Sequence, residues 1–255
     1  MNLMKYNIKY YSLKKAINRE KYFNNRPFFS ENGIDSNKIF FDYILDHIKL
    51  LKNKNNKIKI LDIGTGTGYV PKVLCSISKE NFEIIGMDLA KEMIKIAELK
   101  KNDKRVKYLI ADNYRIPFKE ESFDIVTNKL STRFSLNEVH RVLKKGGIFV
   151  FKEYGQGKGF KEIAKIFKNR YKKTNKSIND YISEIYAIGF EVVIANLYQI
   201  KRNYKLTEIK DIFSMADLVG RFNDKDLIKI KKKLIKNDII KVTSDPFVIF
   251  AKKSG

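Results

Sequence analysis

Three glycines alternate with threonines in a short turn that follows a run of apolar residues. The turn closes the segment ILDIGTGTG, residues 60–68, and an aspartate, Asp62, stands two residues before the first glycine. Glycine adopts backbone angles that are closed to other residues and lets a ligand approach the main chain closely. Open α/β sheets bind nucleotides where a strand ends in such a turn and leads into a helix. The segment therefore predicts a nucleotide-binding crevice.

The spacing of the glycines argues against a dinucleotide. A dinucleotide fingerprint requires glycine at its first, third and sixth positions. The sixth position is Tyr69 when counted from Gly64 and Pro71 when counted from Gly66. The pattern is instead D-x-G-x-G-x-G, with the carboxylate of Asp62 close to the turn.

A second acidic residue, Asp88, ends the next apolar run, residues 82–87. The carboxyl ends of parallel strands meet at one edge of a sheet, so we expect Asp88 across the crevice from the glycine turn. A short carboxylate at this point can accept both ribose hydroxyls of a nucleoside. Dinucleotide enzymes also use an acid here, so Asp88 alone does not distinguish the two classes of cofactor.

Four segments in chain order resemble the motifs of the class I S-adenosylmethionine-dependent methyltransferases, of the methyltransferase type 11 kind. They are DIGTGTG at 62–68, ADNYRIPF at 111–118, SFDIV at 122–126 and EVHRVLKKGG at 138–147. Lys145 replaces the proline of the last motif, which affects the stiffness of that turn. The resemblance covers about residues 57–155. It implies methyl transfer from S-adenosylmethionine and leaves the substrate open.

The resemblance also implies roles for individual residues. Asp62 would lie near the ammonium of the cofactor, Asp88 would bind its ribose, and Asp112 or its neighbour Asn113 would accept a hydrogen bond from the adenine amine. For Asp112, a role limited to capping a turn stays open. The expected cofactor contacts are Asp62, Gly64, Thr65, Gly66, Gly68, Asp88, Leu89, Asp112, Asn113 and Asn128.

We expect the methyl acceptor to meet residues that follow the fourth and fifth strands. These residues are Thr127, Lys129, Glu153 and Tyr154. No catalytic residue is assigned, because the sulfonium methyl is already activated and a general base is needed only if the acceptor starts protonated. His140 lies more than ten residues beyond the fourth strand, and we interpret it as a packing or surface residue.

The elements that would hold these residues form an α/β fold. Apolar runs alternate with helically spaced segments, and the resemblance implies a Rossmann-like fold with a seven-stranded, mostly parallel sheet and helices on both faces. We expect a helical lid between the last two strands, because that connection is long for a compact domain. The expected units are an N-terminal helical and aromatic cap at 1–52, a cofactor-binding core at 53–203, the lid at 204–238 and the final strand at 239–255.

The composition limits the remaining classes of function. No run approaches the ~18 apolar residues of a membrane span, and we expect a cytoplasmic protein. Cys75 is the single cysteine, which excludes internal disulfides and a cysteine-based zinc site. No cluster of histidines and carboxylates has metal-ligand spacing, so no metal is expected.

The net charge leaves two kinds of substrate open. It is +23, from 52 Lys and Arg against 29 Asp and Glu, and such a charge attracts polyanions. An AT-rich genome would produce the same lysine-rich composition. Residues 127–130 read TNKL, where methyltransferases acting on exocyclic amines of nucleic acids carry D/N-P-P-Y.

Three functions follow from these observations. The first is methylation of a small-molecule acceptor. The second is methylation of ribosomal or transfer RNA, suggested by the charge, and the third is a non-catalytic module that binds S-adenosylmethionine. The sequence does not fix the oligomeric state.

Overall fold

The computed structural model describes residues 35–51, 57–131, 133–155, 159–172, 176–216, 218–236 and 238–255. The expected N-terminal cap at 1–52 lies outside these residues except for its last helix, α2 (Ser36–Leu51). Asp35 caps this helix, because its carboxylate accepts a hydrogen bond of 2.7 Å from the backbone N–H of Asn37.

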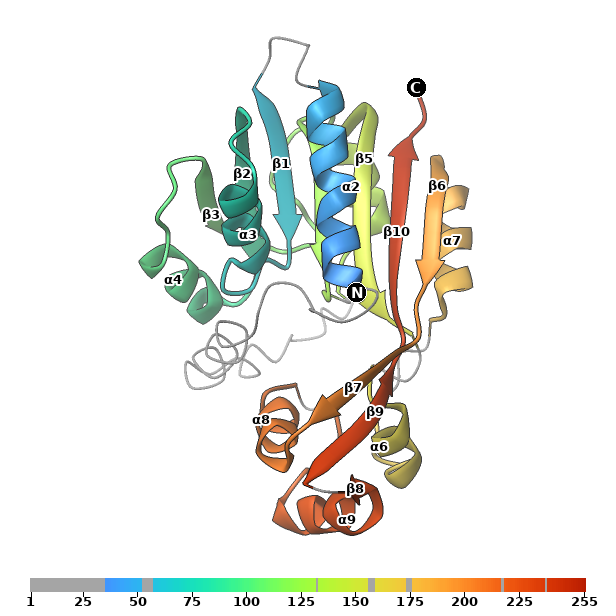
Figure 1. Ribbon diagram of the computed structural model, residues 1–255. Helices are drawn as coiled ribbons and strands as arrows, with labels where there is room; N and C mark the ends of the chain where they lie inside the picture. Colours follow the sequence, from blue (N-terminus) through green and yellow to red (C-terminus); the bar gives the residue numbers. More distant parts are fainter. Residues whose placement is uncertain are drawn as a thin grey trace, which may run out of the picture.

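The chain folds around a seven-stranded mixed sheet, which confirms the expected fold class (Figure 1). The strand order is β3-β2-β1-β4-β5-β10-β6, and β10 runs antiparallel to both of its neighbours. The strands are β1 (Ile58–Ile63), β2 (Phe82–Asp88), β3 (Val106–Ile110), β4 (Phe123–Lys129), β5 (Leu143–Tyr154), β6 (Phe190–Leu197) and β10 (Pro246–Lys253). The order reverses between β1 and β4, which is where open α/β sheets bind their ligands.

Helices cover both faces of this sheet. Helix α2 and α3 (Tyr69–Ile77) pack on one face, while α5 (Leu136–Val142) and α7 (Ile178–Ala187) pack on the other. Helix α4 (Lys91–Leu99) packs beside β2 and β3. The strands of the centre are buried on both faces, as their continuous apolar runs predict.

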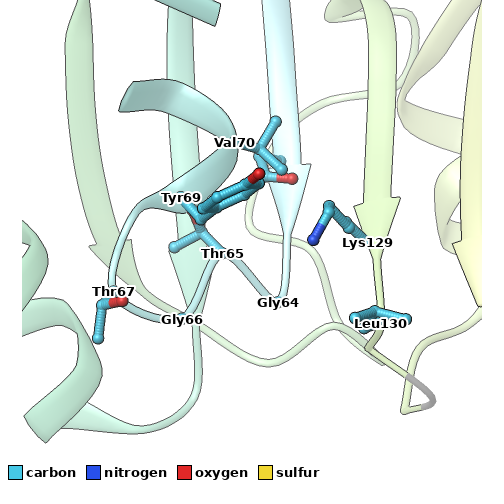
Figure 2. Close-up of a pocket in the computed structure, with 9 residues that line it drawn as sticks. Gly64, Thr65, Gly66, Thr67, Tyr69, Val70, Lys129 and Leu130 are labelled. Carbon is cyan, nitrogen blue, oxygen red and sulfur yellow. The ribbon is translucent and has the colours of Figure 1, made fainter. Parts of the chain in front are cut away.

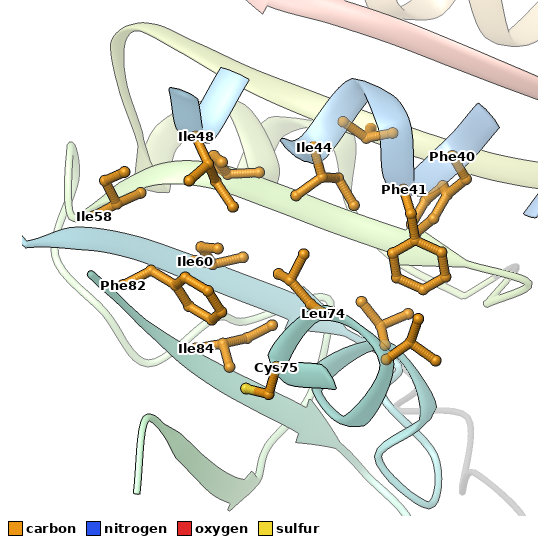
Figure 3. Packing of buried hydrophobic residues seen from close by; sticks show 14 of the residues in the cluster. Phe40, Phe41, Ile44, Ile48, Ile58, Ile60, Leu74, Cys75, Phe82 and Ile84 are labelled. Atoms are coloured by element: carbon orange, nitrogen blue, oxygen red, sulfur yellow. The ribbon is translucent and has the colours of Figure 1, made fainter. Parts of the chain in front are cut away.

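Helix α2 contributes a large part of one core layer (Figure 3). Phe40, Phe41, Ile44 and Ile48 are all fully buried and point toward the sheet, where Ile60 lies opposite them. The spacing of these apolar residues follows one face of a helix. This packing fixes the N-terminal end of α2 at the carboxyl edge of the parallel strands (Figure 1).

A second, smaller unit lies beyond that edge (Figure 1). It combines a three-stranded antiparallel sheet of order β7-β9-β8 with three helices that share a separate core. Its elements are α6 (Lys161–Ile166), β7 (Ile200–Tyr204), α8 (Leu206–Ala216), α9 (Asp224–Leu234), β8 (Ile235–Lys236) and β9 (Ile239–Ser244). We call this set of elements the appended unit.

The appended unit corrects the expected helical lid at 204–238. The two expected helices are present as α8 and α9, but the insertion also contains strands and extends over residues 200–244. Strands β6 and β10 continue into β7 and β9 after short breaks, and the N–H of Tyr198 donates to the carbonyl of Pro246 at the junction. The paired strands β6 and β10 of the large sheet therefore lead directly into the paired strands β7 and β9 of the small one.

Truncation of Ile44 to alanine tests the packing of α2 on the sheet. Because Ile44 is fully buried, we expect Ile44→Ala to lower the free energy of unfolding by about 2–5 kcal/mol. Leu50 on the same helix is 74% exposed, so Leu50→Ala should change it by less than about 0.5 kcal/mol. Urea unfolding monitored by circular dichroism measures both, and equal losses would contradict this packing.

Candidate functional site

The glycine turn between β1 and α3 has a conformation that requires glycine. Gly64 and Gly68 have φ angles of 68° and 83°, in the left-handed region. A Cβ atom at Gly64 would collide with the side chain of Ser131, and one at Gly68 would collide with the ring of Tyr108. The neighbours of Gly64 and Gly68 therefore leave no room for a side chain, whereas a Cβ atom at Gly66 would meet nothing within 4 Å.

Asp88 lies across from this turn at the end of β2, where we expected it. Its Oδ2 atom accepts a hydrogen bond of 2.9 Å from the backbone N–H of Gly66, and its Oδ1 atom accepts one of 2.8 Å from the N–H of Ala90. These bonds fix the orientation of the carboxylate. Each oxygen keeps a further lone pair, so the group can still accept hydrogen bonds from a ribose.

Asp62, at the end of β1, is 1% exposed. Its Oδ1 atom accepts a hydrogen bond of 2.8 Å from the hydroxyl of Thr127 on β4. Its Oδ2 atom and the nearby Thr65 hydroxyl are buried without a hydrogen-bond partner among the described residues. Burial raises the pKa of Asp62 to about 7, although the Thr65 and Thr127 hydroxyls and the charge of Lys129 oppose that shift.

The glycine turn, Asp62 and the end of β4 line one pocket (Figure 2). The residues that form its wall are Asp62, Gly64, Thr65, Gly66, Thr67, Tyr69, Val70, Lys129 and Leu130. The ammonium of Lys129 lies 4.3 Å from the centre of the Tyr69 ring. A buried carboxylate oxygen that lacks a donor suits the ammonium of an amino acid ligand, so this pocket fits the methionine part of S-adenosylmethionine.

The residues expected at the adenine lie in the loops after β2 and β3. Leu89 is 39% exposed beside Asp88, and Asn113 is buried with an Oδ1 atom that lacks a partner among the described residues. The Oδ1 atom of Asp112 accepts a hydrogen bond of 2.9 Å from the N–H of Tyr114. Asp112 therefore caps a turn, and its contact with adenine stays a prediction.

Two expected ligand contacts have supporting roles in the structure. The side-chain amide of Asn128 donates to the carbonyl of Ser131 at 3.0 Å and accepts from its N–H at 3.1 Å. Thr127 is fully buried and donates its hydroxyl to Asp62. Both residues shape the turn after β4 and hold the acid of the pocket. Direct contacts of Asn128 with the cofactor and of Thr127 with the acceptor stay predictions.

The remaining candidates for contact with the acceptor, Glu153 and Tyr154, are consecutive residues at the end of β5 and therefore lie on opposite faces of the sheet. Glu153 is buried, and its carboxylate accepts a hydrogen bond of 2.8 Å from the N–H of Tyr154. Side chains alternate along a strand, so Lys152 and Tyr154 share the face that α2 covers. Lys152 was not among our expectations. The sequence does contain a signal for its burial. Lys152 continues the alternation of Ile148 and Val150, whose side chains are buried on this face of the sheet.

The comparison with known protein families identifies this arrangement. Residues 61–151 match the family model described as a methyltransferase domain. These residues form a methyltransferase domain. The match confirms the resemblance to class I S-adenosylmethionine-dependent methyltransferases, because its range contains the glycine turn, Asp88 and the ends of β3 and β4.

Curated relatives of the methyltransferase domain carry different acceptor names. A ubiquinone/menaquinone biosynthesis C-methyltransferase of Geobacter sp. is 34% identical over 39% of this chain and 47% of its own length. A malonyl-[acyl-carrier protein] O-methyltransferase of Bacillus cytotoxicus is 22% identical over 72% of this chain and 68% of its own length. The chain spans about half the length of the first of these relatives.

Solved structures share the fold of the methyltransferase domain. Phosphoethanolamine N-methyltransferase 2 of Haemonchus contortus, in complex with S-adenosyl-L-methionine, aligns with a TM-score of 0.55 at 20% identity. The alignment covers 96% of this chain and 58% of that protein.

Among the described residues, none of the helices has the length and apolar character that a membrane crossing requires.

The raised pKa of Asp62 predicts a pH-dependent stability. The folded protein holds this proton up to pH about 7, whereas the unfolded chain releases it near pH 3.9. The free energy of unfolding therefore falls as the pH rises between these values. We expect Asp62→Asn, which keeps the acceptor for Thr127, to remove this loss and to exceed the native stability at pH 8 by up to about 4 kcal/mol.

Urea unfolding of both proteins between pH 4 and pH 8 measures the effect. The advantage of Asp62→Asn should shrink toward pH 4, because the unfolded chain binds the same proton as the pH approaches 3.9. Glu191→Gln, at an exposed position of β6, is the matched control and should follow the native curve. A constant difference across the range would show that Asp62 is ionised in the folded protein throughout.

Proposed function

We propose that this chain transfers a methyl group from S-adenosylmethionine to a small-molecule acceptor by in-line displacement. The observation that carries the proposal is the buried, unpartnered Oδ2 atom of Asp62 in a pocket bordered by the glycine turn. Without a ligand, this carboxylate destabilises the folded protein, because a buried acceptor that receives no hydrogen bond costs free energy. A positively charged amino group of the cofactor offsets that cost.

In this proposal, the residues of the pocket bind and orient the cofactor. Asp62 receives the ammonium, the fixed carboxylate of Asp88 receives the ribose hydroxyls, and Asp112 or Asn113 receives the adenine amine. The bound cofactor supplies a methyl group that is already activated. Alignment of the acceptor is then the main task of the protein, and proximity and orientation supply about 7–11 kcal/mol in well-oriented reactions.

A small-molecule acceptor is supported by the names of the relatives. Those names include a C-methyltransferase of quinone biosynthesis and an O-methyltransferase of an acyl-carrier protein. Their acceptor atoms differ although they share the methyltransferase domain, so the domain does not determine the acceptor. The appended unit lies at the carboxyl edge of the sheet, and we assign it the role of shaping the acceptor pocket.

RNA is the second candidate acceptor. The last turn of α9 carries Lys231, Lys232 and Lys233, all exposed on the appended unit. A basic surface of this kind attracts the phosphate backbone of nucleic acids. Lysines at the carboxyl end of a helix also stabilise the helix through its dipole, which accounts for them without RNA. We therefore rank RNA below a small molecule.

Substitution of Asp88 tests the cofactor site. We expect Asp88→Ala to weaken binding of S-adenosylmethionine by about 10- to 100-fold, because it removes hydrogen bonds to a charged group that contribute about 1.5–3 kcal/mol. Isothermal titration calorimetry measures the dissociation constants. Glu191→Ala, which removes an exposed carboxylate from β6, should leave binding unchanged. Unaltered affinity after Asp88→Ala would refute the assigned cofactor site.

A labelling experiment tests the class of acceptor. Purified protein and radiolabelled S-adenosylmethionine are added to a cell extract of the source organism, and the RNA, protein and small-molecule fractions are separated. We expect the label among small molecules and its loss with Asp88→Ala. Label in RNA that ribonuclease removes would replace the small molecule with RNA as acceptor. Absence of label from every fraction would favour the binding module.

A further inference from the structure

Lys152 of β5 is a buried cation with little to neutralise it. It is 1% exposed, and its Nζ atom donates one hydrogen bond, of 2.6 Å, to the side-chain oxygen of Asn37 on α2. It forms no ion pair with any residue that the structure describes. An ammonium carries three donors, so a single neutral amide oxygen leaves most of its hydrogen-bonding capacity unused.

A second buried lysine shows how the same fold satisfies such a group elsewhere. Lys253 is 8% exposed at the end of β10. Its Nζ atom donates to the carbonyl of Leu143 at 2.8 Å and lies 3.9 Å from the carboxylate of Glu121. Burial of an ammonium without a carboxylate costs several kcal/mol. Packing alone therefore does not explain a lysine at position 152.

The register of the sheet places Lys152 next to the cofactor pocket. Lys129 of β4 and Lys152 of β5 are paired residues of parallel strands, and both belong to the face that α2 covers. Lys129 forms part of the pocket wall beside Gly64 and Tyr69 (Figure 2). Lys152 thus lies one strand further from Asp62, toward β10 and the appended unit.

Lys152 lies among charged groups of both signs. Burial lowers the pKa of Lys152 well below its usual value, and the cations of Lys129 and Arg202 lower it further. Asp35 and Glu153 act in the opposite direction. Two paired cations on adjacent strands repel each other. Among the described residues, no carboxylate lies within ion-pair distance of the Lys152 ammonium.

We propose that Lys152, with Lys129 beside it, forms an anion-binding subsite for the methyl acceptor and that the acceptor carries a carboxylate. The inference rests on the proposed methyl transfer and names the class of its substrate. A monoanionic carboxylate neutralises the single ammonium of Lys152, which has no ion-pair partner among the described residues. The carboxylate accepts hydrogen bonds from the unused donors of Lys152 and holds the acceptor on the β5 side of the cofactor pocket.

Simple carboxylates test the subsite without knowledge of the natural acceptor. The full-length protein, saturated with S-adenosylhomocysteine, is titrated with benzoate, with its uncharged analogue benzamide, and with inorganic phosphate. We expect benzoate to bind more tightly than either of the others. Lys152→Met removes the hydrogen bond from the ammonium to the carboxylate of benzoate. We therefore expect it to weaken benzoate binding by about 10- to 100-fold and to leave the binding of benzamide unchanged.

Lys107→Met provides the matched control. Lys107 also lies on a strand of the sheet, β3, but its side chain is 67% exposed, so we expect benzoate affinity to stay at the native value. Methionine has a similar volume, and removal of a poorly paired buried charge should leave the fold as stable or make it more stable. If urea unfolding shows that Lys152→Met does not fold, Lys129→Met tests the same subsite with the same expected loss.

Three results would overturn the proposal. They are equal affinity for benzoate and benzamide, a Lys152→Met variant that keeps native benzoate affinity, and tighter binding of phosphate than of benzoate. Benzoate binding repeated without S-adenosylhomocysteine separates this inference from the proposed function. If the nucleoside fails to bind while benzoate binding still depends on Lys152, the methyltransferase assignment fails and the anion subsite stands.

Discussion

The hydrogen bond from the Thr127 hydroxyl to the buried carboxylate of Asp62 joins β1 to β4 where the strand order of the sheet reverses. Burial of this carboxylate is unfavourable, and the rigid pairing of the two strands maintains it. The glycine turn begins two residues after Asp62, and Lys129 follows two residues after Thr127. The walls of the pocket are thus placed by the same pair of strands. An unsatisfied acid is held where a ligand with an ammonium can neutralise it.

The pairing of β4 with β5 extends this arrangement toward the appended unit. Side chains alternate between the faces of a sheet, so the register that pairs Lys129 with Lys152 also directs both lysines to the face of Asp62. A shift by one residue would replace Lys152 with Phe151 or Glu153 on that face. The hydrophobic contacts of α2 with β1 and β5 oppose such a shift. The polar groups therefore depend for their positions on a large apolar core.

The parts of the fold that follow from local pattern were predicted from the sequence. The central strands are continuous apolar runs, and the turn at Gly64 needs glycine because its φ angle is 68°. Strand β7 was missed because it is short and largely polar, and β9 was predicted as part of the final strand of the core although it pairs in the small sheet. They form through pairing with each other across about 40 residues of chain, which no local pattern reports. The buried position of Lys152 was not predicted for a similar reason, since its hydrogen-bond partner Asn37 lies 115 residues away in the sequence.

The family match covers the middle of the chain, whereas curated relatives align with it over longer stretches. The match ends at residue 151, directly before Lys152, and the appended unit lies entirely beyond it. The glycine turn and the ends of β2 and β3 are inside the match. Relatives whose names give different acceptors are similar to this chain, so the shared domain alone does not determine the acceptor. Lys152 directly follows the match, and its ammonium has a single neutral acceptor among the described residues; the second of these observations supports the acceptor subsite that we propose at this position.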